Sequence, residues 1–163
     1  MTIKNKIVKV KDIAKIAESL KKQKKKIVTT NGVFDILHYG HVSYLEEAKK
    51  LGDVLIVGVN SDASVKINKG DKRPINNEKS RSHVVAALES VDYAVLFNDK
   101  DPRKFLSLIN PDFHVKAGDY NPSQIIEKEI VEKNGGKVVI AKAHKSYSTT
   151  SIISKILNAY KKQ

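Results

Sequence analysis

The 163-residue sequence contains no cysteine and no tryptophan. Without cysteine the chain can form neither disulfides nor thiolate metal sites, and a cysteine nucleophile is excluded. No apolar segment approaches the roughly 20 residues that a membrane-spanning helix requires, and the N-terminus has no apolar run of signal-peptide length. We therefore expect a cytoplasmic protein that does not insert into membranes.

Acidic residues are also scarce, since 18 Asp and Glu face 30 Lys and Arg, which gives a formal net charge of +12. Such an excess is compatible with nucleic acid, an anionic surface or small phosphorylated ligands as partners. Much of it lies in the lysine-rich run 21–26, which lacks the arginine and aromatic residues typical of nucleic-acid-binding surfaces. We expect a solvated basic face and no nucleic-acid partner, while a basic nucleic-acid-binding module is the alternative from another functional class.

Five short apolar runs rich in β-branched or aromatic residues predict strands, and helix-like segments lie between them. The predicted strands are 27–30, 54–59, 93–97, 113–116 and 138–141, and the predicted helices are 11–22, 44–51, 79–88, 103–109, 124–133 and 151–160. This alternation is typical of a parallel sheet with helices on both faces. We predict a single Rossmann-like α/β domain over 1–163 with a five-stranded parallel sheet, in which 1–25 is a helical extension and 26–160 the catalytic core.

The longest irregular stretch, 68–78 (NKGDKRPINNE), is rich in turn-forming residues. It follows a predicted strand, so it should lie at the carboxyl edge of the sheet, where open α/β folds bind their ligands. A long polar loop in a compact domain is often functional.

The stretch 31–41 (NGVFDILHYGH) places two histidines three residues apart after a predicted strand. Asn31-Gly32 would allow a tight turn, and Gly40 would let His41 begin a helix whose N-terminus favours an anion. His38 and His41 would then both project into that site and donate hydrogen bonds to phosphate oxygens. The alternatives are a plain core or surface histidine pair and a zinc site. The zinc site is disfavoured because neither HExxH nor cysteine is present.

The segment TNGVFDILHYGH (30–41) resembles the HxGH signature of the cytidylyltransferase-like nucleotidyltransferase superfamily. A second element of that superfamily, an STT motif that opens a helix, is matched by YSTT at 147–150. Between the two, the sequence closely resembles D-glycero-β-D-manno-heptose 1-phosphate adenylyltransferases. The segments that carry it are NGVFD (31–35), VNSDASV (59–65), Lys69-Gly70, RPI (73–75), ALESVDY (87–93) and KAGDY (116–120).

The sequence departs from that family at two glycines, because Ala117 stands in KAGDY and Ser146 precedes YSTT. The related glycerol-3-phosphate and ethanolamine-phosphate cytidylyltransferases usually read GTFD and carry an arginine shortly before STT. This chain has NGVFD and AKAHKSYSTT at those places. A CTP-dependent cytidylyltransferase for one of those substrates is therefore the nearest alternative.

The resemblance implies that the phosphate of a sugar 1-phosphate attacks the α-phosphorus of ATP and that pyrophosphate leaves. The product would be ADP-heptose for lipopolysaccharide or a related cell-surface glycan. Mg²⁺ is expected through the ATP phosphates, with no metal site made by the protein alone. The resemblance further implies a homodimer, and a stand-alone enzyme because no sugar kinase sequence accompanies it.

The resemblance also implies roles for individual residues. Catalysis would fall to His38, His41 and Lys69, with Lys69 gripping the substrate phosphate. The predicted nucleotide-binding residues are Thr30, Asn31, Gly32, Phe34, Asp35, His38, Gly40, His41, Lys116, Gly118, Asp119, Tyr147, Ser148, Thr149 and Thr150. The predicted substrate-binding residues are Asn60, Asp62, Lys69, Arg73 and Arg81.

Two of these assignments have a structural alternative. Asp35 is equally well suited to be a buried acceptor that holds the turn. The hydroxyls at 148–150 could serve as an ordinary helix N-cap without touching a ligand.

Overall fold

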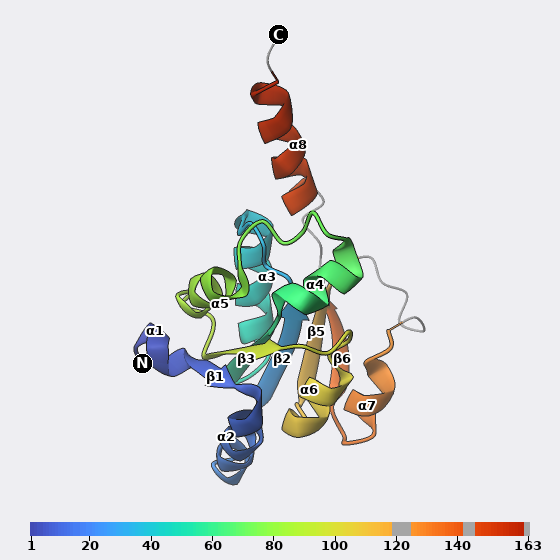
Figure 1. Cartoon of the computed structure of the whole chain (residues 1–163). Helices are drawn as coiled ribbons and strands as arrows, with labels where there is room; N and C mark the ends of the chain where they lie inside the picture. The colour runs from blue at the N-terminus through green and yellow to red at the C-terminus, as the bar shows by residue number, and fades with distance from the viewer. Residues whose placement is uncertain (119–124, 142–145, 162–163) are drawn as a thin grey trace.

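The computed structural model describes residues 1–118, 125–141 and 146–161 (Figure 1). Within these residues it contains one parallel sheet of six strands in the order β1-β4-β3-β2-β5-β6. The strands are β1 (Ile7–Lys9), β2 (Ile27–Gly32), β3 (Val54–Asn60), β4 (Tyr93–Phe97), β5 (Phe113–Ala117) and β6 (Lys137–Ala141). The predicted parallel α/β architecture is confirmed, and the predicted number of five strands is wrong.

The additional strand is β1, at the edge of the sheet. It pairs Ile7 with Ala94 and Val8 with Val95 of β4. Three residues between two helices give no alternating pattern, so sequence periodicity could not reveal this strand. Segment 1–25, which we treated as a helical extension, thus contributes the edge strand.

Eight helices surround the sheet in the described part of the chain. They are α1 (Ile3–Lys6), α2 (Val10–Lys22), α3 (Tyr39–Lys49), α4 (Asp62–Lys69), α5 (Glu78–Ala86), α6 (Arg103–Ile109), α7 (Lys128–Glu132) and α8 (Thr149–Ala159). Of these, α1 and α4 were not predicted. Helix α4 occupies residues between β3 and the polar loop, which therefore begins at Gly70.

The two faces of the sheet bury separate apolar clusters. Central strand β3 shows how: Leu55, Val57 and Val59 join the cluster covered by α3 and α5. Val54 and Ile56 join the cluster covered by α2, α6 and α7. Because successive strand residues point to opposite faces, a wholly apolar strand has to be covered on both sides.

The carboxyl edge of the sheet carries the connections that matter for function. The turn after β2 leads into α3, and α4 follows β3 directly. Helix α8 begins near this edge and points away from the rest of the domain (Figure 1), and none of its residues is buried.

No helix among the described residues is both long enough and apolar enough to cross a bilayer.

Candidate active site

A cavity of about 480 Å³ opens at the carboxyl ends of β2 and β5. Its walls come from the end of β2 and the following turn, the start of α3, the last residue of α4, the end of β5 and the start of α8. The lining residues are Asn31, Gly32, Val33, Phe34, His38, Gly40, His41, Tyr44, Lys69, Lys116, Ala117, Tyr147, Ser148 and Thr149. Segments more than 100 residues apart in the sequence therefore meet around one space.

The two histidines of the HYGH motif lie against each other in this cavity. Their rings are stacked with centroids 3.8 Å apart. His38 is the N-cap residue of α3, in extended conformation, and His41 lies in the first turn of that helix. The Nδ1 atoms of both rings and Oδ1 of Asn31 are buried without a hydrogen-bond partner among the described residues. Buried polar atoms normally have a partner, so these three are suited to meet a ligand.

Burial favours the neutral form of both histidines in the absence of a ligand. Burial lowers the pKa of His38. Burial and, secondarily, the charge of His38 lower the pKa of His41 to about 4. The rings therefore offer hydrogen bonds, and not full positive charges, to an arriving ligand.

Gly40 is what allows the rings to sit so close to the start of α8. A Cβ atom at Gly40 would lie 3.2 Å from Nδ1 of His38 and 3.3 Å from Cβ of Tyr147. The sequence interpretation of Gly40 as a helix-starting residue is thus incomplete, because α3 already begins at Tyr39. Its missing side chain matters for packing.

The turn after β2 is made at Phe34, and not at Asn31-Gly32 as predicted. Asn31 and Gly32 are the last residues of β2 and pair with Gly58 and Val59 of β3. Phe34 has φ of +50°, a left-handed conformation that side chains rarely adopt. Its ring packs over Gly32, where a Cβ would come within 3.0 Å of it, and lies 5.3 Å from the ring of His41.

The STT segment acts as a helix N-cap and also lines the cavity. The Ser148 hydroxyl caps α8 by accepting a hydrogen bond from the Ser151 N–H at 3.0 Å. Ser148 and Thr149 also line the cavity, whereas Thr150 is exposed and does not. Tyr147 packs edge-on against Tyr39, with ring centroids 5.2 Å apart.

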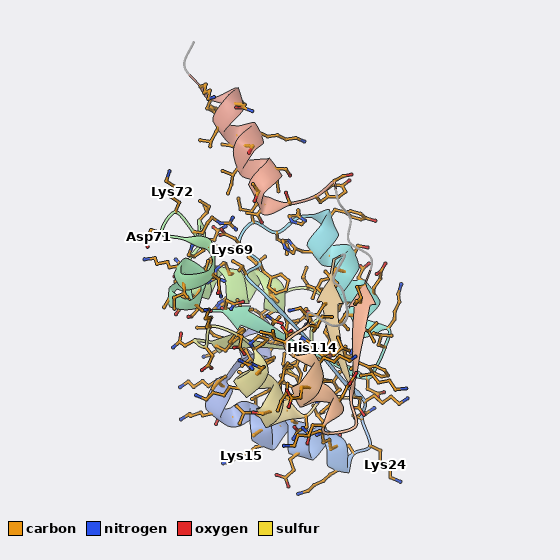
Figure 2. All side chains as sticks on the ribbon, turned by 90° about the vertical axis from the view of Figure 1, so that its right-hand side faces the viewer. Lys15, Lys24, Lys69, Asp71, Lys72 and His114 are labelled. Carbon is orange, nitrogen blue, oxygen red and sulfur yellow. The ribbon has the colours of Figure 1, made fainter. Side chains whose placement is uncertain are left out.

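Two lysines line the cavity. Lys69 is exposed at the end of α4, and Figure 2 shows it at the end of the molecule that bears α8. Lys116, near the end of β5, places its Nζ 2.6 Å from Oε1 of the buried Glu127.

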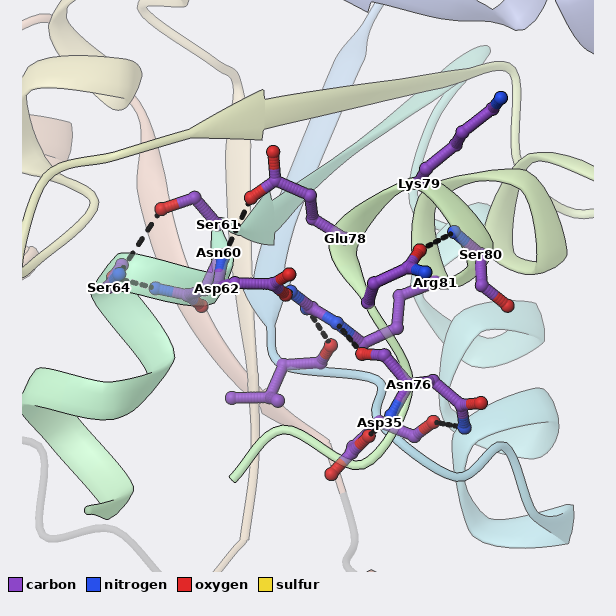
Figure 3. Close-up of polar contacts among 12 residues, drawn as sticks. Asp35, Asn60, Ser61, Asp62, Ser64, Asn76, Glu78, Lys79, Ser80 and Arg81 are labelled. Carbon is purple, nitrogen blue, oxygen red and sulfur yellow. Dashed lines mark hydrogen bonds and ion pairs between the residues drawn. The ribbon is translucent and has the colours of Figure 1, made fainter. Parts of the chain in front are cut away.

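Asp35 proves to be a buried acceptor. Its carboxylate accepts hydrogen bonds from Nε of Arg73 at 2.6 Å and from the backbone N–H groups of Ile75 and Asn76 at 2.9 and 2.8 Å. Figure 3 shows Asp35 beside Asn76. Burial alone would raise the pKa of Asp35, but these hydrogen bonds outweigh it and lower the pKa. Asp35 does not line the cavity, so its contacts fit the structural alternative.

Arg81 ties the same region together from α5. Its guanidinium donates to Val33 O at 2.6 Å, to Asn76 O at 2.9 Å and to Oδ1 of Asp62 at 2.7 Å (Figure 3). The side chain is completely buried. One arginine therefore joins the turn after β2, the polar loop and the start of α4.

The structure does not bring the other predicted substrate residues to the cavity. Asp62, Arg73 and Arg81 bind one another or the turn, and Asn60 donates to the Ser64 hydroxyl at 2.9 Å. Of that predicted set, only Lys69 lines the cavity.

Two further predicted nucleotide-binding residues, Thr30 and Gly118, do not line the cavity. Thr30 is buried and hydrogen-bonded to the Tyr44 hydroxyl. Gly118 donates its N–H to Ala141 O and does not line the cavity. Asp119 lies outside the described residues.

Sequence reasoning missed Tyr44 and Glu127. Tyr44 lines the cavity, and its hydroxyl donates to Val115 O at 2.7 Å, joining α3 to β5. Its position three residues after His41, one helical turn on, was an available signal. Glu127 carries no comparable signal, because its partner lies 11 residues earlier in the sequence.

The described cavity lining contains no aspartate or glutamate. No group of three potential metal ligands occurs among the described residues.

A second cavity, of about 370 Å³, lies at the opposite end of the molecule. Lys21, Lys24, Lys25 and Lys26 line it together with residues at the ends of α6 and α7. Figure 2 shows Lys24 far from Lys69. Three helix C-termini, which attract cations, converge here. Cationic side chains of the basic run are therefore located where helix dipoles favour them.

Comparison with known proteins gives a consistent result. The family model described as "Cytidylyltransferase-like" matches residues 29–155. Proteins named "Bifunctional protein HldE" are similar to the chain: that of Geobacter metallireducens is 49% identical over 148 residues, which cover 91% of this chain and 30% of the relative. That of Salmonella enteritidis is 51% identical over 145 residues, covering 89% and 30%. The chain thus spans about 30% of the length of these curated relatives.

Two solved structures are similar in fold. The lipopolysaccharide core biosynthesis protein from Thermoplasma volcanium superimposes with a TM-score of 0.61 at 36% identity, covering 73% of this chain and 96% of that one. A pantoate-beta-alanine ligase from Francisella tularensis, complexed with beta-gamma ATP and beta-alanine, has a TM-score of 0.61 at 20% identity, covering 93% and 77%. The latter likeness concerns the fold alone.

Proposed function

The chain belongs to the cytidylyltransferase-like family, and we propose that it transfers the adenylyl group of ATP to D-glycero-β-D-manno-heptose 1-phosphate. Nucleotidyl transfer is the activity that the family indicates. The choice of ATP and of the heptose rests on the sequence resemblance. The similarity to proteins named HldE and to a lipopolysaccharide core biosynthesis protein supports it.

The observation that carries the proposal is the joining of the two distant motifs in one cavity. The His38–His41 pair and the Ser148-Thr149 segment, which open α3 and α8 respectively, both line it. Helix N-termini attract anions through their free N–H groups and the helix dipole. Two of them at one cavity suit a ligand with several phosphates.

In the proposed reaction an oxygen of the sugar phosphate attacks the α-phosphorus of ATP. A bond forms between that oxygen and phosphorus as the bond to the β-phosphate oxygen breaks, and pyrophosphate leaves. The protein supplies no nucleophile. Its contribution is to align the two phosphates and to stabilise the charge that develops on their oxygens.

The neutral imidazoles of His38 and His41 would donate hydrogen bonds to phosphate oxygens. Because a buried neutral donor needs no counter-charge, it is ready before the substrate binds. Negative phosphates nearby would then raise the pKa of both rings and favour their charged forms as the transition state is reached.

We assign Lys69 to the sugar phosphate and Lys116 to the nucleotide. Lys69 is exposed at a helix end and makes no ion pair among the described residues, so it can reach a phosphate as a mobile point charge. Mg²⁺ would enter bound to the ATP phosphates, where it neutralises the leaving pyrophosphate.

The test is pyrophosphate release in the presence of Mg²⁺, with ATP and CTP each crossed against heptose 1-phosphate and glycerol 3-phosphate. We expect turnover only with ATP and heptose 1-phosphate. Absence of turnover in all four combinations would refute the proposed activity.

The second candidate is a cytidylyltransferase for glycerol 3-phosphate or ethanolamine phosphate, which the description of the matching family model favours. It predicts turnover with CTP and one of these acceptors. The fold and the roles of the histidines would be the same, so only the substrate assay separates the two candidates.

We propose further that the protein acts in the cytoplasm, where ATP is available, as a homodimer. Exposed apolar residues on α8 and at its C-cap support self-association, since Ile156, Leu157 and Tyr160 are 49%, 61% and 83% exposed. Light scattering at assay concentrations measures the state directly, and a monomeric mass would refute the dimer.

A further inference from the structure

Glu127 is a buried carboxylate that reaches the cavity only through a lysine. It is 3% exposed and does not line the cavity. Its Oε1 lies 2.6 Å from Nζ of Lys116, which does line it. No role for Glu127 follows from the sequence motifs or from the reaction described above.

We propose that Glu127 is a positioning residue that holds the Lys116 ammonium at the wall of the cavity, directed at the oxygens of the bound nucleotide. The inference rests on the proposed function, because it takes the nucleotide to be the ligand of this cavity.

The ion pair with Glu127 orders the Lys116 side chain before a ligand binds. A lysine side chain has four rotatable bonds, and fixing them on ligand binding costs entropy. Lys116 is only 16% exposed, and its ammonium is already fixed by the carboxylate of Glu127. Much of that ordering is therefore complete before the nucleotide arrives.

A lysine ammonium paired with a carboxylate can also bind a ligand. An ammonium has three donors, so it can serve Glu127 and a ligand oxygen at the same time. A buried ion pair returns little net stability, because the cost of removing both charges from water offsets their attraction. The main effect of such a pair is therefore to fix the position of the ammonium group.

The ion pair also brackets the segment between Lys116 and Glu127. Lys116 and Glu127 flank residues 117–126, the segment that includes the predicted nucleotide-binding residues Gly118 and Asp119. An ion pair at 2.6 Å joins the two ends of this segment. Glu127 thus fixes Lys116 and also the points at which the segment leaves β5 and enters α7.

The test compares Glu127→Gln with Glu129→Gln in the full-length protein. Both changes remove one negative charge from the start of the same helix, but Glu129 is exposed and makes no ion pair with any residue that the structure describes. We measure nucleotide affinity by calorimetric titration with ATP and Mg²⁺, and KM and kcat by pyrophosphate release. We expect Glu127→Gln to weaken ATP binding about tenfold or more with kcat changed less than about threefold. Glu129→Gln should match the wild type.

A double-mutant cycle separates positioning from a purely structural role. If Glu127 acts through Lys116, the variant Lys116→Met/Glu127→Gln binds ATP no more weakly than Lys116→Met alone. Multiplicative losses in the double variant would overturn the proposal, as would equal ATP affinity in Glu127→Gln and Glu129→Gln.

Loss of folding in Glu127→Gln would not end the test. Glu127→Asp keeps the charge but withdraws the carboxylate by one methylene, so we expect an intermediate loss of ATP affinity. Wild-type affinity in a folded Glu127→Asp protein would overturn the proposal.

The same measurements distinguish this inference from the proposed function. If the wild-type protein binds CTP and not ATP, ATP is refuted as the proposed substrate. The Glu127 and Glu129 variants are then compared by their affinity for CTP. If it binds neither nucleotide, both fail. Wild-type turnover with ATP, together with unaltered Glu127 variants, refutes the positioning role alone.

Discussion

Replacing Gly40 by alanine should separate the stability of the fold from the activity of the site. Gly40 lies in the first turn of α3, between the two histidines. Alanine is about 1 kcal/mol more favourable than glycine inside a helix, so helix propensity alone would stabilise the protein.

The new methyl group, however, meets the site. It would lie 3.2 and 3.3 Å from Nδ1 and Cε1 of the His38 ring and 3.3 Å from Cβ of Tyr147. Such contacts are tighter than ordinary van der Waals distances, so His38 or the start of α8 has to move by a few tenths of an ångström. Relieving a tight contact of this kind costs about 1–2 kcal/mol, which roughly cancels the gain in propensity.

We therefore expect the melting temperature of Gly40→Ala to stay within about 4 °C of the wild type, because 1 kcal/mol corresponds to about 2–4 °C in a domain of this size. The rate should fall much more. A misplacement of about 1 Å costs about 100-fold in rate, so a shift of a few tenths of an ångström should cost about three- to tenfold in kcat.

The assay is pyrophosphate release at saturating substrates, with the melting temperature measured on the same samples. Glu47→Ala is the matched control, since Glu47 lies exposed on the same helix and does not line the cavity. An unchanged kcat in a Gly40→Ala protein of normal stability would show that the placement of His38 against Tyr147 does not matter for the reaction.

Further predictions concern the remaining groups of the site and one buried histidine. His41→Ala should lower kcat about 100–1000-fold without loss of fold, as judged by circular dichroism, and retained activity would remove His41 from the chemistry. Lys69→Ala should raise the KM for the sugar phosphate more than that for ATP, and the reverse pattern would assign Lys69 to the nucleotide. Burial, and to a lesser degree Lys116, lowers the pKa of His114 from 6.5 to about 3. The unfolded chain therefore binds a proton below pH 6.5 that the folded chain resists, and stability should fall by about 2 kcal/mol between pH 6.5 and 4.5. Urea unfolding measures this loss, which His114→Gln should reduce and the exposed His83→Gln should leave unchanged.

The central strands of the fold could be predicted from the sequence, because they are long, apolar and doubly covered. The start of α4 could not, since its eight residues bury only Ser64 and Val65. Its N-terminus is set by a local device, the Ser61 hydroxyl that accepts from the Ser64 N–H, and by contacts to distant residues. The Asp62 N–H, for example, donates to Glu78 at 2.8 Å.

The residues of the site also divide into those that the sequence could place and those that it could not. Residues contiguous with the two motifs, such as His38, His41 and Ser148, line the cavity because a motif carries its own turn and helix start. The cations in the intervening segments could not be placed, because an arginine in a polar stretch gives no sign of its partner. Arg73 and Arg81 find Asp35 and Asp62, which lie 38 and 19 residues away.

Four cations lie in or near the site, and they differ in whether they form an ion pair. Arg73, Arg81 and Lys116 each meet a carboxylate within 2.7 Å. Each pair joins a segment that borders the cavity to a neighbouring segment that does not. A guanidinium bound on several sides holds backbone rigidly and has little freedom left to follow a substrate. Lys69 alone of the four makes no ion pair in the described chain and ends a helix at a glycine of positive φ. The paired cations are therefore suited to fix the geometry of the phosphate site, and Lys69 is suited to follow the phosphate that moves into it.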